Sequence, residues 1–426
     1  MKRISKAALA ALLVSVAATG LAAAPAFAKK KEDTSGITLN DSVRAAAMTA
    51  KDAITAKNYP AAETAVTQAE TAAKTDDEKY VASMLRYGLA SQMVADRSQS
   101  TNGVYDPTGM FAPLNALISN PRTPPTELPK YLYTLGTISF ETKQWARATS
   151  LFTRAQQAGS TEQNLPLYVI KSKIEGGDVA GGLAQMDALW TANPAQITDD
   201  YYNYAIAKAN KANLRAETVK WMRRQLVSIP TVVQWNETLY FYGLQPQSMV
   251  KLDAGQMVDL FRLLRLSKAI ADQAGYENYI QASAAAGLSS ETKSVIAEAK
   301  AASKLPTPIN PAIATLSTKA DAAVKAEGTL AALDKKAGAA AKGEASAQAG
   351  DAHLGRGEYA KAIALYKQAL SKSVTDTDAV NTRLGIALAA SGDKAGAKAA
   401  FTAVTGAQRT DIAGFWLTWL DTPPTS

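Results

Sequence analysis

Residues 350–403 have the sequence GDAHLGRGEYAKAIALYKQALSKSVTDTDAVNTRLGIALAASGDKAGAKAAFTA, and this stretch decides the fold. The tripeptide at 357–359, Gly-Glu-Tyr, predicts a turn between two helices, because Gly357 can adopt a positive φ without steric cost. Ala362 and Tyr366 follow four residues apart and therefore lie on one face of the second helix. A small residue where the helices cross and a large one where they diverge set how closely such a hairpin closes.

The same pattern returns 35 residues later. In the second copy Gly385, Gly392, Ala397 and Phe401 take the places of Gly350, Gly357, Ala362 and Tyr366. A period close to 34 residues indicates an array of helix–turn–helix units, and this array resembles the tetratricopeptide repeat (TPR) family. The resemblance implies an all-α fold, an α-solenoid of TPR-like helix-turn-helix repeats arranged in one or two helical blocks.

A further repeat is found near Leu132, in which Trp145 replaces the turn tyrosine. Lys143 stands where a helix-ending glycine is expected, so we predict that this turn adopts a different geometry. The residues that the resemblance assigns to packing between repeats are Gly136, Trp145, Ala148, Phe152, Gly350, Gly357, Tyr359, Ala362, Tyr366, Gly385, Gly392, Ala397 and Phe401.

The first 28 residues have the form of an export signal. Three cations precede an Ala/Leu/Val core, and a small-x-small pattern ends at Ala28. The core is too short for a permanent anchor, and no later run approaches the roughly 20 apolar residues of a spanning helix. We therefore expect no membrane span and a periplasmic or secreted protein after cleavage near Ala28.

Charge and cysteine content narrow the class of protein further. The formal net charge is +8, a mild excess for 426 residues, and acids are interspersed throughout. Together with export, this disfavours nucleic acid as a partner. The chain contains no cysteine, which excludes disulfides and a lipid-anchored lipoprotein.

Composition also suggests boundaries. Prolines at 306, 308 and 311 interrupt the helical pattern, and the segment after them is rich in Ala and Lys. A last apolar helix around Phe415 and Trp416 is expected to cap the array, with a docking patch as the alternative. The predicted parts are a signal peptide at 1–28, a disordered basic and polar start at 29–40, a TPR-like helical array with divergent repeats at 41–305, a helical linker at 306–342, and a C-terminal TPR pair with a capping helix at 343–426.

The chain offers few groups for catalysis. His353 is the single histidine, and its place in the repeat predicts a packing role. One histidine without cysteine excludes a Cys/His zinc site and a Ser-His-Asp triad. Ser290 and Lys293 match Ser-x-x-Lys, but the companion motifs are missing and Ser290 suits a helix cap. The acids at 76–78 and 199–200 suit helix starts. We therefore expect no enzyme, no metal and no cofactor.

The resemblance implies binding, because in TPR proteins the first helices of successive hairpins line a concave groove. Alignment assigns the groove residues as Tyr133, Thr137, Phe140, Asn164, Lys171 and Glu175. Burial of Tyr133 and Phe140 under a neighbouring helix is an equal alternative. The expected function is an exported TPR scaffold or adaptor that binds a peptide or protein partner in the cell envelope. The alternatives are an accessory subunit of an envelope enzyme or polysaccharide-secretion complex and, with less support, a carboxylate-dependent cell-wall enzyme.

Overall fold

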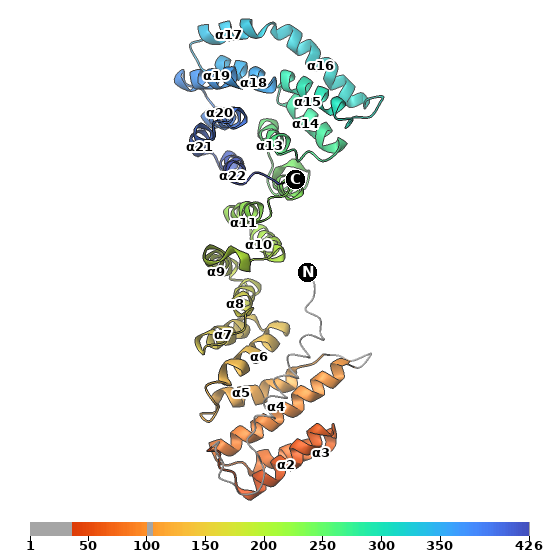
Figure 1. Ribbon diagram of the computed structural model, residues 1–426, viewed down its shortest axis with the longest axis vertical. Helices are drawn as coiled ribbons and strands as arrows, with labels where there is room; N and C mark the ends of the chain where they lie inside the picture. Colours follow the sequence, from red (N-terminus) through yellow and green to blue (C-terminus); the bar gives the residue numbers. More distant parts are fainter. Residues whose placement is uncertain (1–35, 100–104, 426) are drawn as a thin grey trace. The chain divides into compact units, whose positions relative to one another are not determined.

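The computed structural model describes residues 36–99 and 105–425, so the predicted leader and most of the 29–40 segment lie outside the described residues. Within those ranges the named elements are all helices, and the β-type pairing is limited to an isolated bridge between Thr231 and Thr425. The predicted all-α fold class is therefore confirmed (Figure 1). None of the described helices has the length and apolarity that crossing a membrane requires.

The chain divides into two compact units, Met1–Gln196 (unit 1) and Ile197–Ser426 (unit 2). In unit 1 the helices pack mainly against their neighbours in the chain, and α4 contacts both α2 and α3. The helices of unit 1 are α2 (Asp41–Thr55), α3 (Tyr59–Ala72), α4 (Asp76–Gln99), η1 (Thr108–Met110), α5 (Phe111–Ser119), α6 (Leu128–Glu141), α7 (Trp145–Gln157), α8 (Leu165–Glu175), α9 (Val179–Ala192) and η2 (Pro194–Gln196).

Unit 2 contains the remaining helices and is also built from consecutive hairpins. These helices are α10 (Asp199–Lys211), α11 (Arg215–Ser228), α12 (Val232–Leu239), the π-helix η3 (Tyr240–Leu244), α13 (Ala254–Leu266), α14 (Gln273–Ala285), α15 (Ser289–Ala301), α16 (Pro311–Glu327), α17 (Leu330–Ala339), α18 (Glu344–Gly355), α19 (Tyr359–Ser371), α20 (Thr377–Ser391), α21 (Lys394–Thr402) and α22 (Ala407–Asp421).

Side-chain caps start many of these helices. Asn40, Asp178, Asp376 and Asp393 each accept a hydrogen bond from an amide of the first turn that follows. Asp253 forms a reciprocal capping box at the start of α13. The acids at 76–78 and 199–200 lie in the first turns of α4 and α10, where the helix dipole favours negative charge.

Seven hairpins in the described ranges close with the same turn. The residue two positions before the second helix has a left-handed φ of +56° to +102°. The backbone N–H of the residue that follows it donates to the carbonyl oxygen five positions earlier in the chain, at 2.8 to 3.0 Å. This pair of features is the Schellman ending of a helix. The left-handed residues are Lys57, Lys143, Gly177, Asn213, Gly287, Gly357 and Gly392.

The prediction that the turn at Lys143 adopts a different geometry is wrong. Lys143 has φ +59°, compared with +78° at Gly357, and Gln144 N donates to Ser139 O at 2.8 Å. The backbone hydrogen bonds and the packed hairpin therefore hold a lysine in a conformation that side chains disfavour.

Each of three hairpins encloses a small residue against an aromatic ring. A Cβ added at Gly136, Gly350 or Gly385 would lie 2.7, 2.8 or 2.6 Å from the ring sixteen residues later, which belongs to Phe152, Tyr366 or Phe401. The alanines between them in sequence, Ala148, Ala362 and Ala397, are fully buried. The structure thus brings together the small and bulky residues of the repeat pattern, and the hairpins stack within each unit in the manner of an α-solenoid.

The prolines of 306–311 do not separate compact units. Helix α16 packs on α14 and α15, and α17 packs on α18, so the segment predicted as a linker belongs to unit 2 (Figure 1). The physical reason is that α18 also returns to contact α15 directly, which closes this part of the unit on itself. The buried residues of α16 are Ile313 and Ala320, and α17 buries Ala337.

Helix α22 packs on the last hairpin, α20 and α21, and on helices far earlier in the chain. It contacts α11, α13, α20 and α21, and Ile412, Phe415 and Trp416 are fully buried. The alternative of an exposed docking patch is therefore wrong for these three side chains. Neighbouring helices cover α22 on more than one side, because the chain turns back onto α11 and α13 after α21.

Candidate functional site

Two of the six predicted groove residues are buried. Tyr133 is 8% exposed, and its ring centroid lies 5.9 Å from that of Phe152 and 6.1 Å from that of Tyr168. Thr137 is 7% exposed, and its hydroxyl donates to the carbonyl oxygen of Tyr133 at 3.0 Å. The expectation that these two residues face a groove is corrected, because Tyr168 of α8, in the next hairpin, lies against the Tyr133 ring and Thr137 is bonded within α6.

The other four predicted residues, Phe140, Asn164, Lys171 and Glu175, keep accessible surface. Three of these, Asn164, Lys171 and Glu175, belong to α8 or its N-cap and lie on one face together with Tyr168. Asn164, Tyr168, Lys171 and Glu175 are spaced by four, three and four residues, so they share one helix face. Asn164 is exposed and the other three are half-buried. Asn164 is the N-cap residue of α8, but its side chain makes no capping hydrogen bond. Its amide can therefore both donate to and accept from a ligand.

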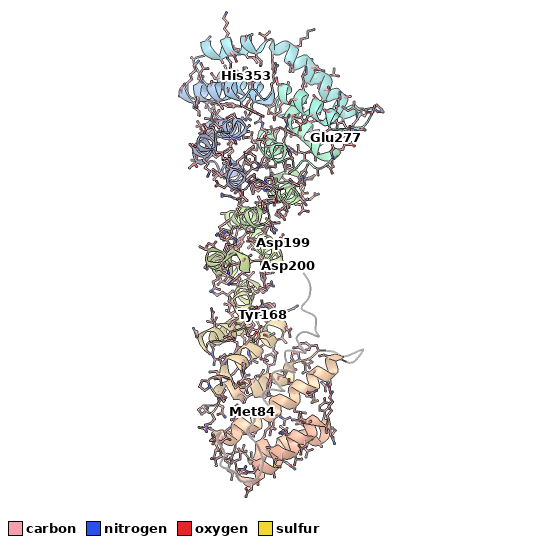
Figure 2. The ribbon with its side chains drawn as sticks, viewed as in Figure 1. Met84, Tyr168, Asp199, Asp200, Glu277 and His353 are labelled. Carbon is pink, nitrogen blue, oxygen red and sulfur yellow. The ribbon has the colours of Figure 1, made fainter. Side chains whose placement is uncertain are left out.

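Tyr168 lies at the centre of this α8 stripe and was missed by the sequence analysis (Figure 2). Phe140 supports its ring edge-on from α6 at a centroid distance of 5.5 Å, and Phe152 stacks on it at 5.1 Å. Burial, and after it the charge of Glu141, raise the pKa of Tyr168 above its ordinary value of 10.0. The hydroxyl therefore stays protonated at neutral pH and can donate a hydrogen bond. Its four- and three-residue spacing from Asn164 and Lys171 was the signal that could have found it.

A buried ionic network occupies the interior of unit 2. Arg262 Nε donates to Glu291 Oε1 at 2.9 Å, and its Nη1 donates to Asp259 Oδ1 at 2.8 Å. Arg409 Nη1 donates to the other oxygen of Asp259 at 3.0 Å. Arg262, Glu291 and Asp259 are 5%, 2% and 0% exposed. The network thus joins α13, α15 and α22.

The network continues onto the C-terminal hairpins. Arg383 Nη1 donates to Asp351 Oδ2 at 2.6 Å, and the Tyr366 hydroxyl donates to Asp351 Oδ1 at 2.7 Å. Arg383 Nε also lies 3.8 Å from Asp259 Oδ1. Residues from α18, α19 and α20 are thereby linked to α13. Three carboxylates, those of Asp259, Glu291 and Asp351, face three guanidinium groups.

These carboxylates are committed to structural pairs. Burial opposes the ionisation of Glu291, but the charge and hydrogen bonds of Arg262 outweigh it and lower the pKa of the carboxyl group. A general acid or base needs a proton at a position that substrate can reach. None of the three carboxylates lines either of the cavities described below. The network holds helices of unit 2 together.

His353 is also part of a structural link. It is 2% exposed, with Nδ1 2.7 Å from Glu358 Oε2 and Nε2 2.8 Å from Asp334 Oδ1 (Figure 2). Asp334 belongs to α17, and Lys361 Nζ lies 3.9 Å from its other oxygen. The histidine therefore ties α17 to the α18–α19 hairpin.

The remaining candidates for chemistry have structural positions. Ser290 is not a cap but lies within the first turn of α15, where its hydroxyl accepts a hydrogen bond from Arg356 Nε at 3.3 Å. Across residues 36–99 and 105–425, no three His, Cys, Asp or Glu side chains are grouped as a metal site would require.

The chain matches no protein-family model, and no curated protein is similar to it in sequence. Among solved structures it is similar to the crystal structure of the pentatricopeptide repeat protein PPR10 from maize, with 14% identity and a TM-score of 0.27. The match covers 97% of this chain and 64% of that chain, so this chain spans less than two-thirds of that protein. The fold is assigned from the hairpins themselves. The chain is an all-α protein of repeated helical hairpins.

Proposed function

We propose that the chain is a non-catalytic helical-repeat scaffold of the TPR type that holds a peptide segment of a partner protein against α8. The observation that carries this proposal is the stripe formed by Asn164, Tyr168, Lys171 and Glu175. The stripe combines the Tyr168 ring, which packs on Phe140 and Phe152, with an amide, a cation and an anion from the other three side chains. Rigid aromatic anchors flanked by polar groups are typical of protein-recognition surfaces.

The stripe suits a peptide better than a small charged ligand. Its lysine and glutamate bear opposite charges, so the surface has no strong preference for either sign of ligand. Asn164 offers both a donor and an acceptor, which match the two groups of a peptide unit. Phe140 belongs to this surface because it is half-buried beneath Tyr168.

Export to the cell envelope is part of the proposal and is supported by the sequence of the first 28 residues. If it is correct, fractionation of the source cells finds the protein outside the cytoplasm, with a mature N-terminus close to Lys29. A cytoplasmic protein that retains Met1 would contradict this part of the proposal and leave the α8 surface untouched.

Site-specific photo-crosslinking tests the α8 surface. A photoreactive phenylalanine analogue in place of Lys171 is expected to capture discrete partners in the source cells. The same analogue in place of Arg154, an exposed residue of α7, is the matched control. Tyr168→Ser should abolish capture from position 171 while leaving the helical circular dichroism unchanged. Equal capture from both positions, or capture that survives Tyr168→Ser, would overturn the proposed site.

A further inference from the structure

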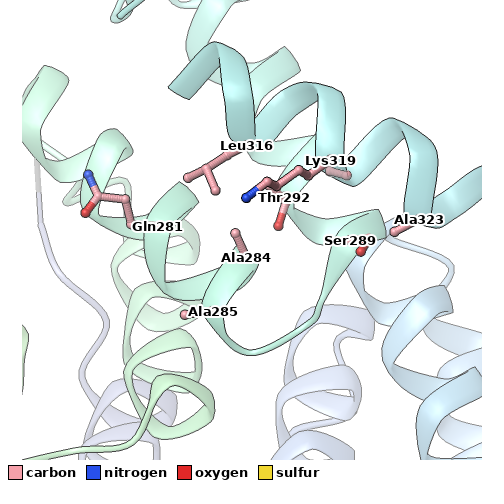
Figure 3. A pocket seen from close by; sticks show the side chains of 9 residues that line it. Gln281, Ala284, Ala285, Ser289, Thr292, Leu316, Lys319 and Ala323 are labelled. Atoms are coloured by element: carbon pink, nitrogen blue, oxygen red, sulfur yellow. The ribbon is translucent and has the colours of Figure 1, made fainter. Parts of the chain in front are cut away.

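Two adjoining cavities flank α14 in unit 2. The larger, about 610 Å³, lies between α14, α13, the π-helix η3 and the segment 245–252. The smaller, about 420 Å³, lies between α14, α15 and α16 (Figure 3). Gln281 and Ala285 line both cavities, so both lie against α14. Both volumes fall in the range of roughly 300 to 1,000 Å³ that is usual for ligand sites.

The walls of the cavities are mainly apolar. Leu244, Val250 and Met257 line the larger one, and part of its wall is η3, a π-helix of a kind that often occurs at functional sites. In the smaller cavity, Leu316 extends from α16 toward Ala284 of α14 (Figure 3). Apolar side chains of a ligand would therefore be removed from water in both places.

The charged side chains that line the cavities are both lysines. Lys251 lines the larger cavity and Lys319 the smaller, and no Asp or Glu of the described ranges lines either. Lys319 is exposed and forms no ion pair within the part of the chain that the structure describes. Lys251 donates to Pro246 O at 2.6 Å, which leaves its ammonium with further donors. Gln281 is exposed and lines the larger cavity together with Lys251 and the smaller one together with Lys319.

We propose that this α14 surface binds a peptide segment of a partner protein in which apolar side chains stand next to Asp or Glu. The apolar side chains enter the two cavities, the carboxylates pair with Lys251 and Lys319, and Gln281 contacts the peptide backbone. A second copy of this chain is a poorer occupant, because it carries the same net positive charge. The inference extends the proposed function to a second surface and does not depend on the α8 stripe.

The test measures fluorescence anisotropy of labelled synthetic peptides with the mature chain. The acidic probe is Asp-Leu-Glu-Leu-Asp-Leu-Glu-Leu, and its amide counterpart is Asn-Leu-Gln-Leu-Asn-Leu-Gln-Leu. We expect the acidic probe to bind at least tenfold more tightly. Changing both Lys251→Met and Lys319→Met should remove this preference, because methionine retains an apolar stem without the charge. Affinity for the amide probe should stay unchanged.

Two control variants establish whether the acidic preference belongs to this surface. Lys335→Met with Lys336→Met removes two exposed charges from α17 and should leave acidic-probe binding unchanged. Tyr168→Ser should also leave it unchanged, so failure of the α8 surface and failure of this site are distinguishable. The proposal is overturned if both probes bind equally, if the α17 control loses the acidic preference as well, or if the Lys251 and Lys319 changes have no effect in a chain with wild-type circular dichroism.

Discussion

Adding a single methyl group at Gly385 tests how the repeats are packed. The new Cβ of Gly385→Ala would lie 2.6 Å from the ring of Phe401, whereas carbon atoms in favourable contact are about 3.5–4.0 Å apart. The ring is fully buried and stacks on Trp416 at a centroid distance of 5.7 Å, so it has little room to move. Helices α20 and α21 must therefore separate by roughly 1 Å.

The expected cost follows from two opposing effects. Overpacking of this kind costs about 1–3 kcal/mol, while replacing glycine by alanine within a helix contributes up to about 1 kcal/mol of stability. Gly338→Ala provides a matched control, because a Cβ there meets nothing within 4 Å and the residue lies in α17. We expect Gly385→Ala to be less stable than Gly338→Ala by about 1–3 kcal/mol.

Urea unfolding followed by circular dichroism measures this difference, and hydrogen exchange locates it. Amides of α20 and α21 should exchange faster in Gly385→Ala, whereas those of unit 1 should not change. Equal stability of the two variants, with unchanged protection of α20 and α21, would show that Gly385 does not lie against the Phe401 ring and would refute the packing of the repeats described above.

Three further changes probe other contacts. Glu291→Gln removes one of the two carboxylates that pair with the buried Arg262 and should destabilise unit 2, by up to about 3–5 kcal/mol in urea unfolding followed by tryptophan fluorescence. Glu78→Gln should lower stability at pH 7 but not near pH 2. Backbone amides of Thr75, Lys74 and Asn40 lower the pKa of Glu78 from 4.5 to about 2, so its stabilisation is complete above pH 4.5 and is lost as the pH falls toward 2. Lys143→Gly should raise the free energy of unfolding by about 1 kcal/mol, measured by urea unfolding, because it removes a left-handed side-chain residue.

Each of these changes has its own contradicting result. For the network, Glu291→Leu combined with Arg262→Met should recover much of the loss, and a double variant as unstable as Glu291→Gln would argue against the loss of the Arg262–Glu291 charge pair as the cause. A pH-independent effect of Glu78→Gln would show that the carboxylate is not held ionised by the backbone. If Lys143→Ala stabilises as much as Lys143→Gly, the left-handed conformation is not the source of the gain.

The residues of one hairpin were predictable because their interactions are local. Gly385 and Phe401 are sixteen residues apart, and helical periodicity with a left-handed turn is enough to bring them together. The turn at Lys143 was predicted wrongly, because glycine preference was taken as a requirement when the hairpin can hold a lysine in the same conformation. The sequence left the burial of Tyr133 and its exposure in a groove as equal alternatives, since the choice depends on a ring from the next hairpin, Tyr168.

By itself the sequence determined the all-α class, the hairpins, their turns and their small-to-bulky interiors, because each of these arises from residues within about one repeat of one another. Only the tertiary structure decided that α22 lies inside unit 2, that Asp259 meets Arg409 across 150 residues, and that α14 is flanked by two cavities. These features depend on which helix faces meet over long distances in the chain. Many pairings of such faces bury similar apolar area, so periodicity alone cannot select one.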